Sequence, residues 1–477
     1  MDRGRLSSLF GVDSRSLAAF RVALGVVLLA DLWIRSGSMV PLLTDEGFFT
    51  RELAMELAPQ PLFSPFHMAT GSVAGTTVLM VLQALLAGAF IVGFRTRVIA
   101  AISLVMLVSL HQRNLLATSA IDSLFRFYLL WCIFLPMGES WSVDALRSRR
   151  REHRWVCSVA SAALLLQAWF LYWHAVVSKF QADAWLEGRA VYSVLAKASY
   201  AQPLGDALLA WPEVLHALTM ATLFIEGAVV VLLFLPWATA RVRIGVFFVN
   251  FFFQLGLWLC LDIGVFQPLA MAVLIPFLPS RFWERIGRAR AVELRAWQPR
   301  SRRLERLRQA ICASLLFVCS TSVVVATPKA RPFVPEPLPT LYNRAFLYQS
   351  FRLFANTDST LQGWWLVLGR PAEGRLPINL MTGEDVTDPY ARPFYFVGTQ
   401  WGQHWIMFHR GALRPRYRSR VFPAMAEWFC AHWNDENPDR LVRDVQIVLF
   451  RENNYAPDVV ATIEQERLSL ASCESRD

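Results

Sequence analysis

Long apolar runs, separated by short arginine-rich segments, dominate the first two thirds of the chain. About nine runs are long enough, or nearly so, to cross a hydrocarbon core of ~30 Å as helices. The third, fourth and eighth are short, so we expect them to tilt little or to lie inside a bundle. The pattern predicts a polytopic α-helical membrane protein with spans near residues 16–35, 72–94, 98–112, 122–138, 155–179, 214–238, 243–262, 263–280 and 310–327.

The pattern changes after residue 328. A proline-rich linker, Pro328 to Pro339, leads into polar and aromatic sequence with turn signals. Residues 363–368 and 442–450 have the composition of strands, and residues 421–433 that of an amphipathic helix. We therefore expect a transmembrane domain over residues 1–328 and a soluble α+β domain over 329–477, which is long enough to bury its own core.

Composition agrees with a membrane protein. The 477 residues are 55% hydrophobic and only 18% charged, with a mean hydropathy of +0.36, which excludes an ordinary soluble fold and disorder. A net charge of +10 would ordinarily raise nucleic acid as a partner. Here the cations sit in short loops between apolar runs, so membrane topology explains them and lipid, not nucleic acid, is the expected partner.

The basic loops predict orientation. Arginines cluster at the N-terminus and after the second, fourth, sixth and eighth runs, near residues 95–97, 147–154, 241–243 and 281–308. By the positive-inside rule these segments face the cytoplasm, which places the C-terminal domain outside. The dominance of arginine over lysine indicates a GC-rich, bacterial source. We expect a multi-pass protein of the inner (plasma) membrane.

The cysteines and histidines offer little metal chemistry. No CxxC or HExxH spacing occurs and the eight histidines are scattered, so no metal site is expected. Cys430 and Cys473 are the only cysteines of the external domain, and an oxidising compartment could join them. The other five lie in or beside spans and are expected to be small packing residues: Cys132, Cys157, Cys260, Cys312 and Cys319.

Several charges lie inside or beside the predicted spans, where each costs several kcal/mol without a partner. Asp122 and Arg126 are four residues apart and can pair on one helix face. Arg21, Asp31, Arg126 and Glu226 are expected to form buried structural pairs that hold the bundle together. The alternative is a polar chamber that opens outward.

Lys179 is unusual among the cations because only three of the 47 basic residues are lysine. It ends the fifth span on the predicted outer side. One interpretation is a lysine that extends its ammonium group to the membrane interface. The other is a general base, since a lysine amine loses its proton readily when desolvated and an arginine does not.

Several motifs resemble the vitamin K-dependent gamma-carboxylase family. The opening from Phe20 to Gly47 and the segment Trp141–Asp144 are similar to it, as is Ile263–Phe266. The most specific motif runs from Lys179 to Gly188, where Lys, Asp, Trp, Glu and Gly recur at the family's spacing. The resemblance covers about residues 17–280 and points to the bacterial branch called HTTM (horizontally transferred transmembrane) proteins.

The resemblance implies a lyase that acts on a glutamate of a secreted peptide or protein. In the animal enzyme, a lysine at the position of Lys179 deprotonates reduced vitamin K, and reaction with O2 gives a strong base. That base removes a γ-proton from glutamate, CO2 adds, and the quinone becomes an epoxide. A bacterial menaquinone could replace vitamin K, and no metal is required.

Two family histidines are absent from this chain. Residues 119–123 and Gln254 stand where they would be. At the outer ends of the third and fourth spans, His111, Arg113, Asn114 and Asp122 are either substitutes or structural polar residues. The candidates for a substrate or quinone pocket are therefore His111, Arg113, Asn114, Asp122, His174, Asp183, Trp185, Glu187 and Gln254, around a catalytic Lys179. His174 lies off the Lys179 helix face, so no direct relay between the two is expected.

Two functions remain open at this point. The first is a carboxylase-like enzyme that uses a reduced naphthoquinone, O2 and CO2. The second is a non-carboxylating relative that binds a lipid, quinone or peptide and assists maturation or export of a secreted peptide. A transporter would need internal repeats or interrupted helices, and the sequence has neither signal.

Overall fold

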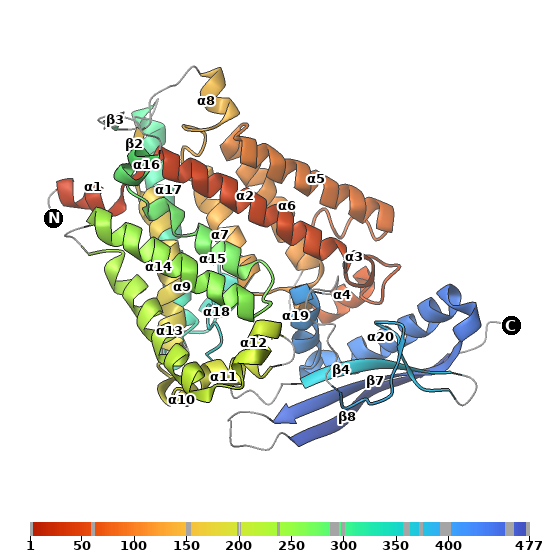
Figure 1. The fold of residues 1–477 in the computed structure, drawn as a ribbon. Helices are drawn as coiled ribbons and strands as arrows, with labels where there is room; N and C mark the ends of the chain where they lie inside the picture. The colour runs from red at the N-terminus through yellow and green to blue at the C-terminus, as the bar shows by residue number, and fades with distance from the viewer. Residues whose placement is uncertain are drawn as a thin grey trace.

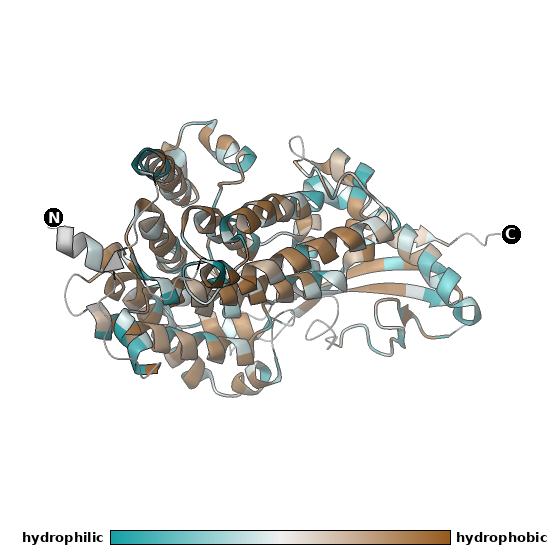
Figure 2. Ribbon diagram, turned by 90° about the horizontal axis from the view of Figure 1, so that it is seen from above, coloured by the Kyte–Doolittle hydropathy of each residue, from teal (hydrophilic) through white to brown (hydrophobic). Residues whose placement is uncertain are grey.

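The computed structural model consists of a helical bundle with an antiparallel five-stranded sheet and two helices at one end (Figure 1). Figure 2 shows that hydrophobic residues dominate the long helices. The structure describes residues 3–58, 63–148, 154–197, 200, 202–235, 239–286, 295–296, 301–327, 329–355, 363–371, 375–391, 402–453 and 462–473.

Six helices in the described residues are long and apolar enough to cross a membrane, which confirms a mostly helical membrane architecture. They coincide with the first, second, fifth, sixth, seventh and ninth predicted spans. Their bounds are α2 Ser14–Ser36, α5 Val73–Val92, α9 Val159–Lys179, α13 Pro212–Leu232, α14 Thr239–Cys260 and α17 Arg302–Val325.

The other three predicted spans are also helical but do not meet that test. The third and fourth correspond to α6, Thr96–Arg113, and α7, Ala120–Phe134. The eighth is split into α15, Phe266–Ala272, and the 3₁₀ turn η2, Ile275–Phe277. At 1.5 Å per residue this apolar stretch is roughly 18 Å long, too short for a straight crossing. The prediction of nine spans and the side of the membrane stay predictions.

Local sequence explains where these helices begin and end. Ser72, Ser119 and Ser158 cap α5, α7 and α9, each accepting a backbone N–H of the first turn. Pro212 occupies the first turn of α13, where its missing N–H costs nothing. Gly93 ends α5 with φ of +74°, a conformation that glycine adopts without strain.

Short elements connect the bundle. A small three-stranded sheet joins β1 Val12–Asp13, β2 Arg154–Val156 and β3 Arg295–Ala296 in that order. The short helices are α1 Arg3–Phe10, α3 Met39–Leu43, α4 Arg51–Leu57, η1 Leu115–Ala117, α8 Val143–Arg147, α10 Asp183–Leu186, α11 Ala190–Leu195, α12 Pro203–Leu208, α16 Ser280–Ile286, η3 Arg331–Phe333 and α18 Leu338–Arg344.

The C-terminal part contains the predicted strands and helix. Its five-stranded sheet has the order β6-β5-β4-β7-β8, with every described pair antiparallel. The sequence did not predict the other five elements of this part, which are β5, β6, α19, η5 and β8. The bounds are β4 Gly363–Pro371, β5 Ile378–Asn379, β6 Glu384–Asp385, α19 Gly402–Ala412, α20 Pro415–Glu436, η5 Pro438–Arg440, β7 Val442–Asn453 and β8 Thr462–Ser472.

The cysteines follow the predicted division with one exception. Cys430 of α20 and Cys473, which follows β8, form a disulfide with a Cα–Cα distance of 5.4 Å. Cys132, Cys312 and Cys319 are buried and Cys260 is half-buried, as packing residues should be. Cys157 is exposed, because it lies in the connection between β2 and α9 and not within the bundle.

Side chains of the C-terminal part dock on the bundle. In α20, Trp428 donates its indole N–H to the Glu46 carbonyl oxygen at 2.7 Å. In α19, Arg410 donates to the Tyr200 hydroxyl at 2.6 Å. The predicted boundary at residue 328 therefore separates two sequence regions that are in direct contact.

Candidate functional site

An apolar cavity of about 370 Å³ lies between α9, α13 and α14. Helical periodicity explains its walls, because residues three or four apart share one face. On α9 the lining residues are Leu171, Tyr172, Ala175 and Lys179. On α13 they are Leu218, Thr222, Ile225 and Glu226.

Lys179 and Glu226 form an ion pair in this cavity. The Lys179 Nζ donates to Glu226 Oε1 at 2.6 Å and Oε2 at 2.5 Å. The side chains are only 3% and 8% exposed. Glu226 lies roughly 20 Å along α13 from its first residue, and Lys179 is the last residue of α9. Among the described lining residues these are the only two with a formal charge at neutral pH.

Trp185 and a segment of the C-terminal region close one side of the cavity. The Trp185 ring lies 4.7 Å from Lys179 Nζ, within cation–π range. Its indole N–H donates to the Phe354 carbonyl oxygen at 2.8 Å. Phe354, which lines the cavity beside Leu353, has φ of +52°. The site therefore needs residues from both parts of the chain.

Two neutral polar side chains complete the cavity. The Tyr172 hydroxyl donates to Asn250 Oδ1 at 2.8 Å and so has a partner. Gln254 is 2% exposed, and its Oε1 has no hydrogen-bond partner among the described residues. A buried acceptor without a donor is costly. A ligand hydroxyl or N–H group would relieve that cost.

Only some residues of the lysine motif line the cavity. Of its polar residues, Lys179 and Trp185 line the cavity, whereas Asp183 and Glu187 are exposed. Glu187 accepts from Arg189 Nε at 2.7 Å. Gly188 has φ of +78°, and a Cβ there would lie 2.1 Å from the His216 ring, so only glycine fits.

The Ile263–Phe266 motif reaches the same cavity. Ile263 and Phe266 line it, and Gly264 turns the chain between them with φ of +62°. Two segments that carry the family resemblance, far apart in sequence, thus converge on one site.

A second cluster of buried charges lies at the ends of α2, α6 and α7. Arg35 pairs with Asp31 at 2.7 Å and also with Asp122. His111 Nε2 is 3.0 Å from Asp122 Oδ1, and His404 of α19 is 3.3 Å from Asp31. This cluster joins the bundle to the C-terminal part and is separate from the described cavity lining.

The pairing predicted between Asp122 and Arg126 is wrong. The buried Asp122 carboxylate accepts the backbone N–H of Ser119 at the start of α7 and also pairs with Arg35. It can contact both groups from one position. Arg126 instead donates to Ser123 Oγ at 3.0 Å and lies 3.3 Å from His111 Nδ1.

Arg21 also departs from its predicted ion pair. Its guanidinium donates to backbone carbonyls, including Met137 at 2.7 Å and Trp141 at 2.5 Å. The described residues offer it no carboxylate within ion-pair distance. The carbonyls at the end of α5 and after α7 are satisfied in this way, so Arg21 is structural without a carboxylate partner.

Three further pocket candidates have structural contacts outside the cavity. Arg113 donates to the Phe49 carbonyl oxygen at 2.9 Å. Asn114 donates to the Leu42 carbonyl oxygen at 3.1 Å and caps η1. His174 accepts from the Phe351 N–H at 3.0 Å and is not among the lining residues. Of the nine pocket candidates, Trp185 and Gln254 are the two in the described lining.

Sequence reasoning missed the role of Glu226 as the partner of Lys179, and it missed Tyr172. The sequence predicts only a structural charge at Glu226, because a pairing across 47 residues has no sequence signature. The spacing of Leu218, Thr222 and Glu226 on one face of α13 was the available signal, since it places the carboxylate on a stripe facing other helices.

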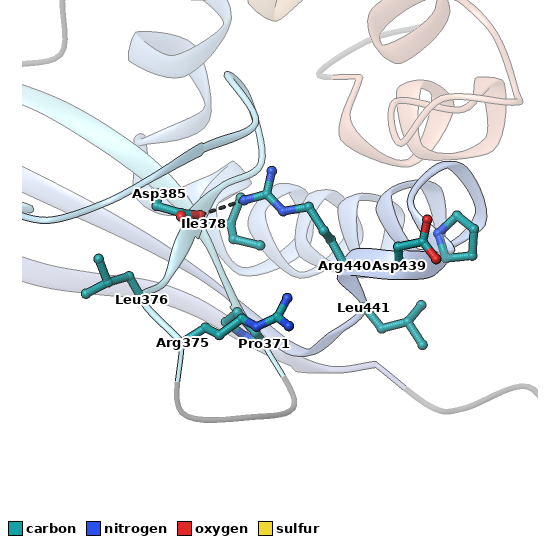
Figure 3. A pocket seen from close by; sticks show the side chains of 9 residues that line it. Pro371, Arg375, Leu376, Ile378, Asp385, Asp439, Arg440 and Leu441 are labelled. Carbon is teal, nitrogen blue, oxygen red and sulfur yellow. Dashed lines mark hydrogen bonds and ion pairs between the residues drawn. The ribbon is translucent and has the colours of Figure 1, made fainter.

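A second hollow of about 470 Å³ lies on the C-terminal sheet (Figure 3). Arg440 lines it and pairs with Asp385 at 2.6 Å, as Figure 3 shows. Arg440 also donates to the Gly383 carbonyl oxygen at 3.0 Å. It holds no sequence-predicted site residue. No group of three or more potential metal ligands occurs in the part of the chain that the structure describes.

Together these features define a helical membrane protein with an acid–base pair buried in an apolar cavity. The HTTM domain family model matches residues 11–283, which include Lys179, Glu226 and Gln254. The chain belongs to the HTTM domain family, as its motifs predicted, and this membership is consistent with a relationship to the vitamin K-dependent carboxylases. A search of curated proteins and a search of solved structures each found no match.

Proposed function

We propose that this protein is a carboxylase-related membrane enzyme that oxidises a reduced naphthoquinone with O2 and uses that reaction to carboxylate a glutamate of a secreted peptide. The observation that carries the proposal is the Lys179–Glu226 pair, buried in an apolar cavity beside Gln254, whose Oε1 has no hydrogen-bond partner among the described residues. The chain's membership of the HTTM domain family supports it.

The residues present fit a flat apolar ligand with ionisable hydroxyls. A cavity of about 370 Å³ is within the size range of small-molecule sites. Phe266 and Phe354 provide apolar walls, and Gln254 Oε1 offers an acceptor for a hydroxyl group. A reduced naphthoquinone bound here would supply, with O2, the oxidation that drives removal of the glutamate proton.

The buried pair supplies the acid–base chemistry. When the pair accepts one proton from a ligand hydroxyl, its net charge rises from zero to +1. That charge then stabilises the anion left beside it, and apolar walls strengthen the attraction because they exclude water. General bases of this kind contribute about 100-fold or more to a proton transfer.

A second candidate is a non-carboxylating relative that binds the same kind of ligand and assists maturation or export of a peptide. The favouring observation is that the described cavity lining contains no histidine, while His111 and His174 contact other groups. Both candidates use the same cavity, and they differ in turnover.

Turnover in lipid discriminates the two. Purified protein in nanodiscs would receive reduced menaquinone or reduced vitamin K, O2, labelled bicarbonate and a glutamate-rich peptide. Lysine-dependent epoxide together with fixed label supports the carboxylase. Epoxide without label supports quinone oxidation with another acceptor. No epoxide with any quinone, in a protein that still binds them, supports the binding relative.

A further inference from the structure

We infer that Glu226 is the group that takes the proton and that Lys179 remains an ammonium ion that stabilises the resulting anion. This assignment rests on the proposed function, because it divides the roles within that site. It makes Glu226 a catalytic residue, and it changes the role of Lys179 from base to electrostatic stabiliser.

The geometry of the pair carries the assignment. Both carboxylate oxygens of Glu226 accept from Lys179 Nζ, at 2.6 and 2.5 Å. The Trp185 ring, at 4.7 Å from Nζ, adds a second interaction that favours a cation. A protonated amine has no lone pair for another proton. A carboxylate oxygen that accepts one hydrogen bond keeps capacity to accept a second.

The described lining residues include no competing base. In the described lining the only other groups that titrate are Tyr172 and Cys260. Tyr172 already donates its hydroxyl proton to Asn250. His174 accepts a hydrogen bond from the backbone N–H of Phe351, and the His216 ring packs against Gly188. Neither histidine is among the described lining residues.

The step balances without an additional reagent. The ligand O–H bond breaks, an O–H bond forms on Glu226, and the electron pair stays on the ligand oxygen. No electrons leave the ligand at this stage. The charge of ligand plus pair is zero before and after, so the transfer adds no net charge to a low-dielectric site.

Two conservative substitutions separate this assignment from a lysine base. Lys179→Arg keeps the positive charge but removes any usable base, since arginine stays protonated. Glu226→Gln keeps the shape of the side chain but removes its basicity. With reduced menadione as probe under argon, the bound anion is read from its absorbance, so proton removal is observed without oxidation.

We expect Glu226→Gln to slow formation of the bound anion about 100-fold and Lys179→Arg to retain most of the wild-type rate. Glu213→Gln, the same change at an exposed position on α13, is the matched control. Anion lost in Lys179→Arg but kept in Glu226→Gln would overturn the assignment and leave the proposed function standing. Failure of the wild type to bind reduced menadione would overturn both.

Chemical rescue covers the case in which Glu226→Gln folds poorly. Glu226→Gly leaves room for a small carboxylate, and formate or acetate should restore the anion, with the rate following the basicity of the added acid. Rescue of thermal stability without rescue of the anion would show that Glu226 is structural only, which would overturn the assignment.

Discussion

Lys179 and Glu226, 47 residues apart on α9 and α13, hold each other in hydrogen bonds of 2.6 and 2.5 Å inside an apolar cavity. Each side chain alone would be a buried charge without a partner. The pair explains why this membrane core tolerates both, and it places an acid and a base where a ligand can reach them.

Breaking the pair on one side should destabilise the fold. Lys179→Met or Glu226→Leu leaves one uncompensated buried charge, at a cost of about 3–5 kcal/mol each. The double variant Lys179→Met/Glu226→Leu removes both charges and should melt within a few degrees of the wild type in nanodiscs. A double variant as unstable as the sum of the singles would mean that the two side chains are not coupled.

We expect Gln254 to contribute to ligand affinity and not to the stability of the fold. Gln254→Leu removes a buried acceptor that has no partner among the described residues, so the melting temperature should stay the same or rise. Affinity for menadiol should fall about tenfold, equivalent to ~1.4 kcal/mol. Equilibrium binding measures this. Gln83→Leu, the same change at a buried glutamine of α5 outside the described cavity lining, should leave the affinity unchanged.

We expect the second charge cluster to stabilise the fold through the Asp122–Arg35 pair and not through an Asp122–Arg126 pair. Asp122→Asn deprives Arg35 of one of its two carboxylates and should lower stability by about 3 kcal/mol. Arg126→Met removes a half-buried cation that has no carboxylate within ion-pair distance among the described residues, and should cost less. Equal losses of thermal stability in the two variants would support an Asp122–Arg126 pair within α7 and contradict this prediction.

Acid should destabilise the protein through His67, which lies outside the spans. Burial lowers the pKa of His67 to about 4, whereas in the unfolded chain its value is near 6.5. Between these values the unfolded state binds more protons, so stability is complete above about pH 6.5 and is lost as the pH falls toward 4. The loss should reach about 3 kcal/mol.

The comparison with His67→Asn isolates this effect. The difference in unfolding free energy between wild type and variant should be constant above pH 7 and should shift in favour of the variant as the pH falls below 6.5. A difference that stays constant down to pH 4 would show that His67 does not titrate in this range.

The sequence was sufficient to predict helices and strands that have a local signal in the chain. Apolar runs predicted α2, α5 and the other long helices, and strand-like composition predicted β4 and β7. It did not predict β8, Thr462–Ser472, because an edge strand with polar residues on its exposed positions has no apolar run.

The candidate site was harder to predict because its residues meet only in three dimensions. The lysine motif identified Lys179 and Trp185, which line the cavity, but it also drew attention to Asp183 and Glu187, which are exposed. Phe354 lines the cavity although it lies 169 residues after Trp185 in the sequence. No periodic pattern in the sequence predicts the contact between these two residues.

The most direct test measures quinol oxidation by the folded double variant Lys179→Met/Glu226→Leu beside the wild type. The assay follows epoxide from reduced menaquinone with O2 in nanodiscs, for samples with matched melting temperatures. We predict active wild type and a loss of at least about 100-fold in the variant, since the acid–base pair is gone while the cavity remains. Equal turnover in the two proteins would contradict the claim that this pair performs the chemistry.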